Sequence, residues 1–232
     1  MNEGLQTVYG GFGDATAYAA QRNRVLRNTY ALLALSMLPT VLGAWIGVST
    51  GVMARMGTGM SAIIFLVGAF GFMFAIEKFK NSATGVALLL GFTFFMGLML
   101  SRMLSAILGL SNGASLIMYA FGTTAAVFFG MASLATVIKR DLGGMGKFLF
   151  VGAILLLVAG LINLFVQSSV LMMTISVIAA GLFSAYMLYD IKQVMDGGET
   201  NYVSATLTIY LDIYNVFQSL LALFGIFGGE RD

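Results

Sequence analysis

The chain of 232 residues contains no cysteine and no histidine, a single proline, and only 9% charged residues. Without cysteine there is no disulfide, thiolate nucleophile or zinc–thiolate site, and without histidine there is no Ser–His or Cys–His couple. A soluble domain carries about 25% charged residues, so this chain has too few for a water-facing surface. A net charge of +2 is also too small to indicate a nucleic-acid partner. Any ionisable chemistry must therefore use ten acids, twelve bases and nine tyrosines.

Hydrophobic residues make up 59% of the chain and form long continuous runs. Seven runs are long enough to cross a bilayer as helices, which takes about 20 residues. They cover residues 30–49, 60–76, 85–108, 115–138, 148–166, 170–189 and 204–227. Because the runs do not alternate with polar residues, they exclude a transmembrane β-barrel. The sequence therefore predicts an all-α polytopic protein of the lipid bilayer, with a polar tail at residues 1–29 and a seven-helix membrane domain at residues 30–232.

The basic residues predict the orientation of the spans, because cytoplasmic loops carry an excess of lysine and arginine. With the N-terminus inside, nine basic residues fall on the inner side: Arg22, Arg24, Arg27, Lys78, Lys80, Lys139, Arg140, Lys147 and Lys192. The outer side receives only Arg55, Arg102 and Arg231. The N-terminus is therefore expected in the cytoplasm and the C-terminus outside, with Arg102 reaching the outer interface. No cleavable signal peptide is expected, because the first apolar run is long enough to span.

Small residues within the runs indicate where helices approach one another. Gly43 and Gly47 form a GxxxG pattern in the first run. Such a pattern lets two helix backbones pack closely, either within one bundle or across a dimer interface, and packing within one bundle is the favoured interpretation. The 16 methionines are interpreted as adaptable packing residues rather than as metal ligands.

One acid, Asp212, lies well inside the last apolar run, about 12 Å along the helix from Ser204. A charged group inside a span is costly, so it is a functional hypothesis by default. The helical period places Thr208, Asn215 and Ser219 on the same face as Asp212. This polar stripe predicts a last helix that is held centrally and lined by water or by carbonyls of its neighbours. The alternative is a buried acid that its neighbours merely satisfy.

A second acid, Asp190, ends the sixth run and precedes the turn sequence Asp196-Gly197-Gly198. Such a turn predicts an antiparallel hairpin, which brings Asp190 close to Asp212 in the cytoplasmic half. Two carboxylates in a poorly solvated site cannot both ionise cheaply, so the pair is expected to share a proton. With Thr208, Asn215 and nearby carbonyls, the pair could bind calcium weakly and transiently, or relay protons. The alternative for Asp190 is an ordinary interfacial acid beside Lys192.

Several sequence motifs resemble the Bax inhibitor-1 (transmembrane BAX inhibitor motif) family. The run Arg24-Val25-Leu26-Arg27-Asn28-Thr29-Tyr30 enters the first span, and Lys139-Arg140-Asp141-Leu142-Gly143-Gly144-Met145-Gly146 joins the fourth to the fifth. The strongest match comprises Leu188-Tyr189-Asp190, then Gly197-Gly198-Glu199-Thr200-Asn201-Tyr202, then Leu211-Asp212-Ile213-Tyr214-Asn215-Val216-Phe217. The match covers the whole chain and looks most like the bacterial YccA-like branch.

The resemblance implies a seventh helix surrounded by the other six, and a pH-sensitive calcium leak governed by a di-aspartyl sensor. That sensor maps onto Asp190 and Asp212, with calcium as the permeant ion and no cofactor. Family members carry an arginine near the end of the second helix that latches one aspartate; here that region holds Lys78 and Lys80 instead. A lysine would then have to serve as the latch, with a point charge in place of a bidentate fork. For the bacterial branch, the resemblance also implies the inner membrane and association with the FtsH membrane protease.

Three functions therefore compete. The leading hypothesis is an ion-leak protein with Asp190 and Asp212 as its proton-sensitive gate. The second is a regulatory protein that binds a membrane protease of the FtsH type, with residues 1–29 as the handle. An intramembrane aspartyl protease is disfavoured, because Tyr210-Leu211-Asp212 lacks the Gly-x-Gly-Asp turn of those enzymes, and the one proline, Pro39, is far away. The chain is therefore expected not to be an enzyme.

Overall fold

The computed structural model describes residues 3–229, and the surroundings of side chains from residue 19 onward. Within that part of the chain every regular element is an α-helix. The eight helices are α1 (Glu3–Thr50), α2 (Val52–Arg55), α3 (Thr58–Phe79), α4 (Ala83–Leu108), α5 (Gly113–Val137), α6 (Met145–Val166), α7 (Ser169–Asp196) and α8 (Tyr202–Gly228). All but the single-turn α2 are long and apolar enough to cross a membrane, and each overlaps one predicted span. The all-α, seven-span prediction is confirmed.

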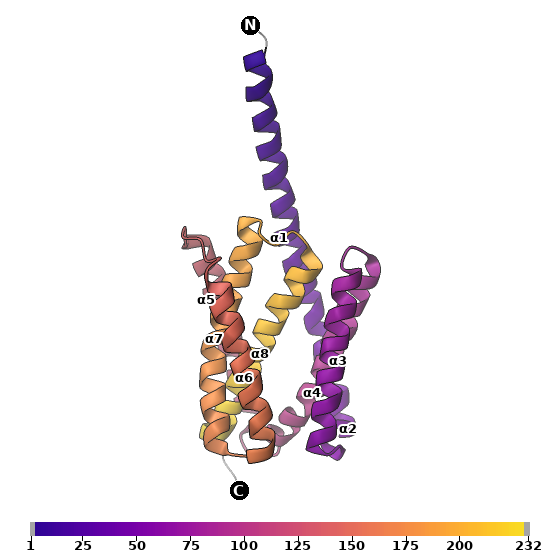
Figure 1. The fold of residues 1–232 in the computed structure, drawn as a ribbon. Coiled ribbons are helices and arrows are strands. Elements are labelled where there is room, and N and C mark those ends of the chain that lie inside the picture. Colours follow the sequence, from indigo (N-terminus) through magenta and orange to yellow (C-terminus); the bar gives the residue numbers. More distant parts are fainter. Residues whose placement is uncertain (1–2, 230–232) are drawn as a thin grey trace.

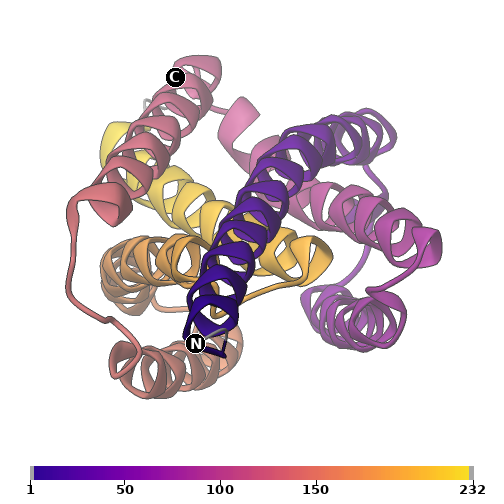
Figure 2. The same ribbon diagram turned by 90° about the horizontal axis from the view of Figure 1, so that it is seen from above.

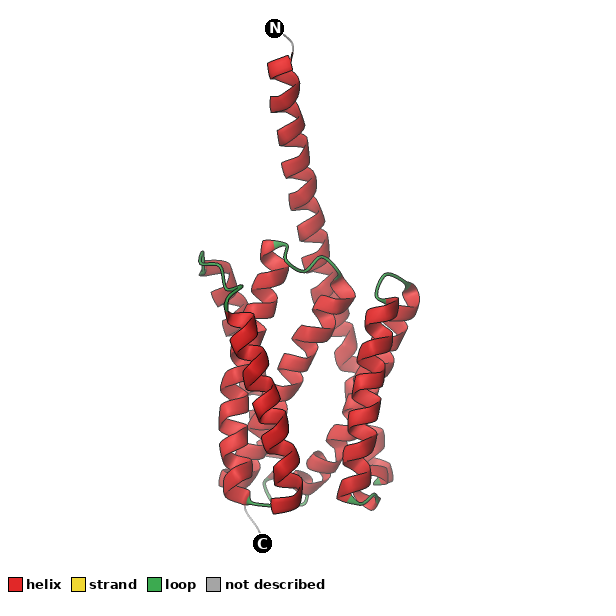
Figure 3. Cartoon of the chain, in the orientation of Figure 1, coloured by secondary structure: helices red, strands yellow, loops and turns green. Residues whose placement is uncertain are grey.

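The long helices run alternately up and down, so the start of α1 and the end of α8 lie at opposite ends of the bundle (Figure 1). The turns α3–α4, α5–α6 and α7–α8 lie at the end where α1 enters, which we call the N-terminal end (Figure 3). Of the basic residues that the sequence assigns to the inner side, Lys80, Lys139 and Arg140 lie in these turns, and Lys78 and Lys147 lie in the adjoining helix ends. Arg231 lies outside the described residues. At the opposite end, Arg102 donates to Thr58 Oγ1 at 2.8 Å and to Met56 O at 3.3 Å. Arg102 therefore reaches the polar edge of the bundle, as expected.

The last helix, α8, is the centre of the bundle. It packs against α1, α3, α4, α5 and α7, and in the view from the N-terminal end it passes through the middle of the helices beneath α1 (Figure 2). In its most apolar window 44% of the residues are buried, against 6% in the peripheral α6. The predicted central position of the seventh span is therefore confirmed, but five of the other spans rather than all six pack against it, because α6 packs on α7.

Glycines allow α1 and α4 to pack backbone against backbone. A Cβ atom on Gly43 would lie 2.1 Å from the carbonyl oxygen of Phe94, and one on Gly97 would lie 2.0 Å from that of Thr40. On Gly47 it would lie 2.3 Å from Ser101 Oγ. No side chain fits at such distances, so both glycines of the GxxxG pattern are covered by α4. The interpretation that this pattern serves packing within one bundle is confirmed.

Helix α1 runs without interruption from Glu3 to Thr50, so the expected boundary between tail and membrane domain at residues 29 and 30 is not a break in the helix. Val25 and Thr29 are buried, and Thr206 Oγ1 on α8 donates to Thr29 O at 3.3 Å. The change in hydropathy at this point marks where α1 enters the apolar part of the membrane, and the helix itself does not end there. The helical period continues across it and keeps Val25, Thr29 and Leu33 on one buried face.

Candidate functional site

The hairpin of α7 and α8 positions the two acids. Helix α7 ends at Gly197, which adopts the left-handed conformation (φ 81°) that terminates helices and that glycine adopts without strain. Asp190 lies six residues before the end of α7, and Asp212 lies ten residues after the start of α8. Since the helices are antiparallel neighbours, these offsets put both acids in the half of the bundle nearer the N-terminal end.

The structure brings the two carboxyl groups together. The side chain of Asp190 lies close to those of both Asp212 and Thr208. Asp212 is only 4% exposed, and its Oδ2 has no hydrogen-bond partner among the described residues. Over the same part of the chain, neither aspartate forms an ion pair with a lysine or arginine. Asp212 is therefore buried and Asp190 half-buried, with no compensating cation among the described residues, an arrangement that is costly unless a proton or a cation neutralises it.

A tyrosine that the sequence reasoning missed adjoins the pair. Tyr186 lies one turn before Asp190 on α7, close enough to sense the charges of both Asp190 and Asp212. Its ring stacks on Phe183, with the ring centres 5.9 Å apart. The four-residue spacing from Asp190 was the signal that could have identified it, because residues i and i+4 share a helix face.

The predicted polar stripe on α8 divides into parts with different surroundings. Thr208 is exposed and lies beside Asp190, and its hydroxyl donates to Ala205 O at 3.2 Å. The side chain of Asn215 turns back to its own helix and donates to Leu211 O at 2.7 Å. Ser219 is buried further along α8, nearer the opposite end. Of the three supporting residues, the structure therefore brings only Thr208 to the acid pair.

Neither lysine of the expected latch pairs with an aspartate of the site in the part of the chain that the structure describes. Lys80 forms an ion pair with Glu77 rather than with either aspartate, and the ammonium of Lys78 lies 5.6 Å from the centre of the Phe79 ring. Glu77 is three residues from Lys80 at the same helix end, whereas Asp212 lies deeper in the bundle. The nearer acid therefore takes the lysine, and its hydrogen bond raises the pKa of Lys80.

Tyrosines fix the opposite face of α8 against α1 and α4. The hydroxyl of Tyr210 hydrogen-bonds Thr40 Oγ1 of α1 at 2.9 Å, and that of Tyr214 donates to Met96 O of α4 at 3.3 Å. Both residues stand two positions from Asp212, so their side chains point away from the acid pair. Buried tyrosines with satisfied hydroxyls thereby set the rotation of α8 that directs Asp212 toward α7.

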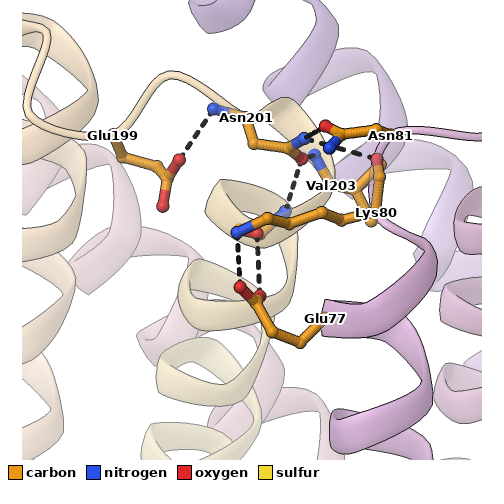
Figure 4. Close-up of polar contacts among 7 residues, drawn as sticks. Glu77, Lys80, Asn81, Glu199, Asn201 and Val203 are labelled. Carbon is orange, nitrogen blue, oxygen red and sulfur yellow. Dashed lines mark hydrogen bonds and ion pairs between the residues drawn. The ribbon is translucent and has the colours of Figure 1, made fainter.

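The first turn of α8 is fastened to the α3–α4 corner by one side chain, Asn201 (Figure 4). Its Oδ1 accepts hydrogen bonds from Val203 N at 2.9 Å and Ser204 N at 3.2 Å, which caps the helix. Its Nδ2 donates to Asn81 Oδ1 at 2.7 Å and to Lys80 O at 3.3 Å. These bonds link the α7–α8 turn to the α3–α4 turn. Below this contact, Ser204 Oγ donates to Glu77 Oε2 at 3.3 Å.

Replacement of Asn201 separates its two roles. Asn201→Ala removes both the cap and the bridge, and is expected to lower the free energy of unfolding by about 1–2 kcal/mol. Asn201→Ser keeps an oxygen that can cap the helix but cannot reach Asn81. Its free energy of unfolding should therefore exceed that of Asn201→Ala by about 1 kcal/mol. Thermal or denaturant unfolding in detergent measures both. Equal stability of the two variants would contradict the capping role, and wild-type stability of Asn201→Ser would contradict a separate bridging role.

Comparison with known proteins fits this arrangement. Residues 22–229 match the family model described as "Inhibitor of apoptosis-promoting Bax1". An "Uncharacterized membrane protein" of Vibrio cholerae is 39% identical over 210 residues, covering 89% of this chain and 91% of that protein. The "Modulator of FtsH protease YccA" of Escherichia coli K12 is 34% identical over 203 residues, covering 88% and 90%, and its counterpart in another Escherichia coli strain is named "Inner membrane protein YccA". This multi-pass membrane protein therefore belongs to the Bax inhibitor-1 family.

Proposed function

We propose that this protein is a cation leak of the bacterial inner membrane, permeable to calcium, and that a proton shared by Asp190 and Asp212 controls it. The observation that carries the proposal is the proximity of two carboxyl groups, one of them buried, in the half of the bundle nearer the N-terminal end, with no basic partner among the described residues. Burial of such a pair is least costly when one proton lies between the two carboxyls.

Loss of the shared proton has two consequences that act in the same direction. The two carboxylates then repel each other, which favours separation of α7 from α8 around the turn at Gly197. The site also gains negative charge, which attracts a cation into it. Protonation reverses both effects. The leak is therefore expected to rise as the pH rises through the titration of the pair and to fall as the pair is neutralised.

Calcium fits the oxygen chemistry of the site only weakly. Calcium takes six to eight oxygen ligands, and the described residues contain no group of three or more acids that could hold a metal ion. Two carboxylates and the hydroxyl of Thr208 leave most of the coordination shell to water and carbonyls. Such a site suits transient passage rather than storage.

The test is calcium entry into liposomes that hold the purified protein and a calcium-sensitive dye, measured over a range of pH. We expect entry above that of protein-free liposomes, rising with pH, and lost in the Asp190→Asn/Asp212→Asn double variant. Asp196→Asn is the matched control, because Asp196 lies on the same helix but is exposed and paired with Lys192 at 2.8 Å. Entry equal to that of empty liposomes, or unchanged in the double variant, would refute the proposal.

Similarity to the Escherichia coli protein named as a modulator of FtsH protease favours a second candidate function. In this alternative the protein binds a membrane protease of that type. The part of α1 that extends beyond the bundle is then the handle, meaning the segment that the protease contacts (Figure 1). The positive-inside rule would place this extension in the cytoplasm.

Deletion of residues 2–18 tests the handle without removing Val25 and Thr29, which pack in the bundle. We expect co-purification of the protease with the full chain at native expression, and its loss on deletion while calcium flux is retained. Retention of the protease by the truncated chain would exclude α1 as the handle. Absence of the protease from the full chain would exclude this function.

A further inference from the structure

Two cavities flank Tyr202 at the N-terminal end of the bundle. The first, of about 440 Å³, lies between α1 and the start of α8 and is lined by Gln21, Arg24, Val25, Asn28, Thr200 and Tyr202, among others. The second, of about 510 Å³, lies between the α3–α4 corner and α8, and includes Lys80 and Asn81 in its lining. Both volumes fall in the range of about 300–1,000 Å³ that small-molecule sites occupy.

The two cavities differ in whether their basic side chain already pairs with an acid. Lys80 in the second cavity is already paired with Glu77. Arg24 in the first cavity has no carboxylate partner among the side chains that the structure describes. Its planar guanidinium, with the amides of Gln21 and Asn28 and the hydroxyl of Thr200, offers the donors that a phosphate group accepts. The first cavity is therefore the one equipped to bind an anion.

The level of this cavity in the molecule fits a lipid headgroup. Arg24 lies about 9 Å, or six residues, before Tyr30, where the apolar run begins. Tyr202 is the first residue of the last span. The cavity therefore lies where a spanning helix leaves the hydrocarbon, at the end of the bundle that carries most of the basic residues. Basic pockets between helices at this level bind acidic phospholipid headgroups.

The face of α1 that lines the cavity continues as an exposed apolar strip. Leu35, Leu38 and Leu42 follow Arg24 at intervals of 11, 14 and 18 residues, which returns each of them to nearly the same side of the helix. They are 45%, 61% and 53% exposed. A mostly apolar cavity that holds Arg24 and continues into a strip of exposed leucines matches a molecule with a charged head and hydrocarbon chains.

We propose that the cavity at Arg24 binds the phosphate of an acidic phospholipid of the surrounding membrane, with the acyl chains lying along Leu35, Leu38 and Leu42. The guanidinium of Arg24 pairs with the phosphate, and the side chains of Gln21, Asn28 and Thr200 hydrogen-bond its oxygens or the adjoining glycerol. The proposal is independent of ion flux, and its test involves no flux measurement.

The test compares lipid binding by the detergent-purified protein, using native mass spectrometry and the rise in melting temperature on lipid addition. The probes are dioleoylphosphatidylglycerol, zwitterionic dioleoylphosphatidylcholine, short-chain dihexanoylphosphatidylglycerol and inorganic phosphate. Arg24→Gln is matched with Arg22→Gln, which removes the same charge from the opposite side of α1. Both arginines are exposed, so both variants should fold, and equal melting temperatures without lipid will show it.

We expect dioleoylphosphatidylglycerol to bind and to raise the melting temperature, and the other three probes to do so much less. Arg24→Gln should weaken binding by about tenfold through loss of a charge-assisted hydrogen bond, and Arg22→Gln by less than about twofold. If Arg24→Gln fails to fold, Arg24→Lys tests the same contact and should weaken binding severalfold. Equal losses at both arginines would mean that only the overall charge attracts lipid. Equal binding of the phosphatidylcholine would exclude headgroup recognition, and equal stabilisation by inorganic phosphate would indicate a small-anion site. Any of these three results overturns the proposal.

Discussion

Replacement of Asp212 by asparagine is expected to abolish the pH dependence of calcium flux while the protein remains folded. For a single titrating proton, the ratio of protonated to deprotonated sites changes by about tenfold per pH unit. The calcium flux of the wild-type protein can therefore change by at most about tenfold per pH unit. In Asp212→Asn the site can carry at most one negative charge. Neither repulsion between two carboxylates nor the second charge can then develop. Flux should stay at the low level of acidic pH and vary by less than about twofold over the same range.

Two further variants make this result specific. Asp190→Asn should flatten the response in the same way, because either carboxyl is needed for the shared proton. Asp196→Asn should keep the wild-type response, because Asp196 is exposed and bonded to Lys192. Flux is measured in liposomes with matched protein content. A pH response that survives in Asp212→Asn, or that disappears equally in Asp196→Asn, would contradict the assignment.

Stability separates a gating effect from misfolding. Asp212 is buried, and one of its carboxyl oxygens has no hydrogen-bond partner among the described residues. Asparagine keeps the size of the aspartate and can donate its amide N–H to Asp190 in place of the shared proton, so the melting temperature of Asp212→Asn should stay close to that of the wild type. A marked fall in melting temperature would instead assign Asp212 a structural role.

The second large effect concerns the contact between α1 and α4. Gly97→Ala introduces a Cβ that would lie 2.0 Å from Thr40 O, an atom of the backbone that cannot rotate away. The two helices must separate, which should lower the free energy of unfolding by about 3 kcal/mol. Gly71→Ala is the matched control in a neighbouring helix, where a Cβ would meet nothing within 4 Å. Since alanine favours helix over glycine by about 1 kcal/mol, this control should be neutral or stabilising.

Thermal unfolding in detergent measures both glycine variants. The expected signs are opposite, which excludes a general effect of replacing glycine in a membrane helix. Gly43→Ala should resemble Gly97→Ala, because its Cβ would lie 2.1 Å from Phe94 O. If Gly97→Ala and Gly71→Ala had equal stability, the close packing of α1 on α4 would be refuted.

The spans could be predicted from the sequence because the low-dielectric membrane requires long apolar helices, and few charges interrupt them. The central position of α8 followed from the polar stripe around Asp212, since only a helix sheltered by others can carry an acid in its middle. The start of α1 could not be predicted in the same way. Hydropathy changes near Tyr30, whereas the face that packs on α8 already includes Val25 and Thr29.

The parts of the site that sequence reasoning missed depend on contacts between distant helices. Asn201 could be recognised as a helix cap from its position before Tyr202, but nothing local indicates that its amide reaches Asn81, 120 residues away. The lysine latch is not formed in the structure for a related reason, because Glu77 lies close to Lys80 in the sequence and forms an ion pair with it. Likewise, the partner of Tyr210 is Thr40, 170 residues earlier. Such pairings are set by the packing of whole helices.

The most direct test of the central claim, that a proton shared by Asp190 and Asp212 controls the leak, is the infrared carboxyl band of the protein as pH is raised. The spectrum is recorded on the same liposomes that are used for calcium flux. The account predicts a protonated-carboxyl band that disappears with the same midpoint at which flux rises, and that both changes are lost in Asp212→Asn. A flux transition with a different midpoint, or one that persists in Asp212→Asn after the band is gone, would contradict the account.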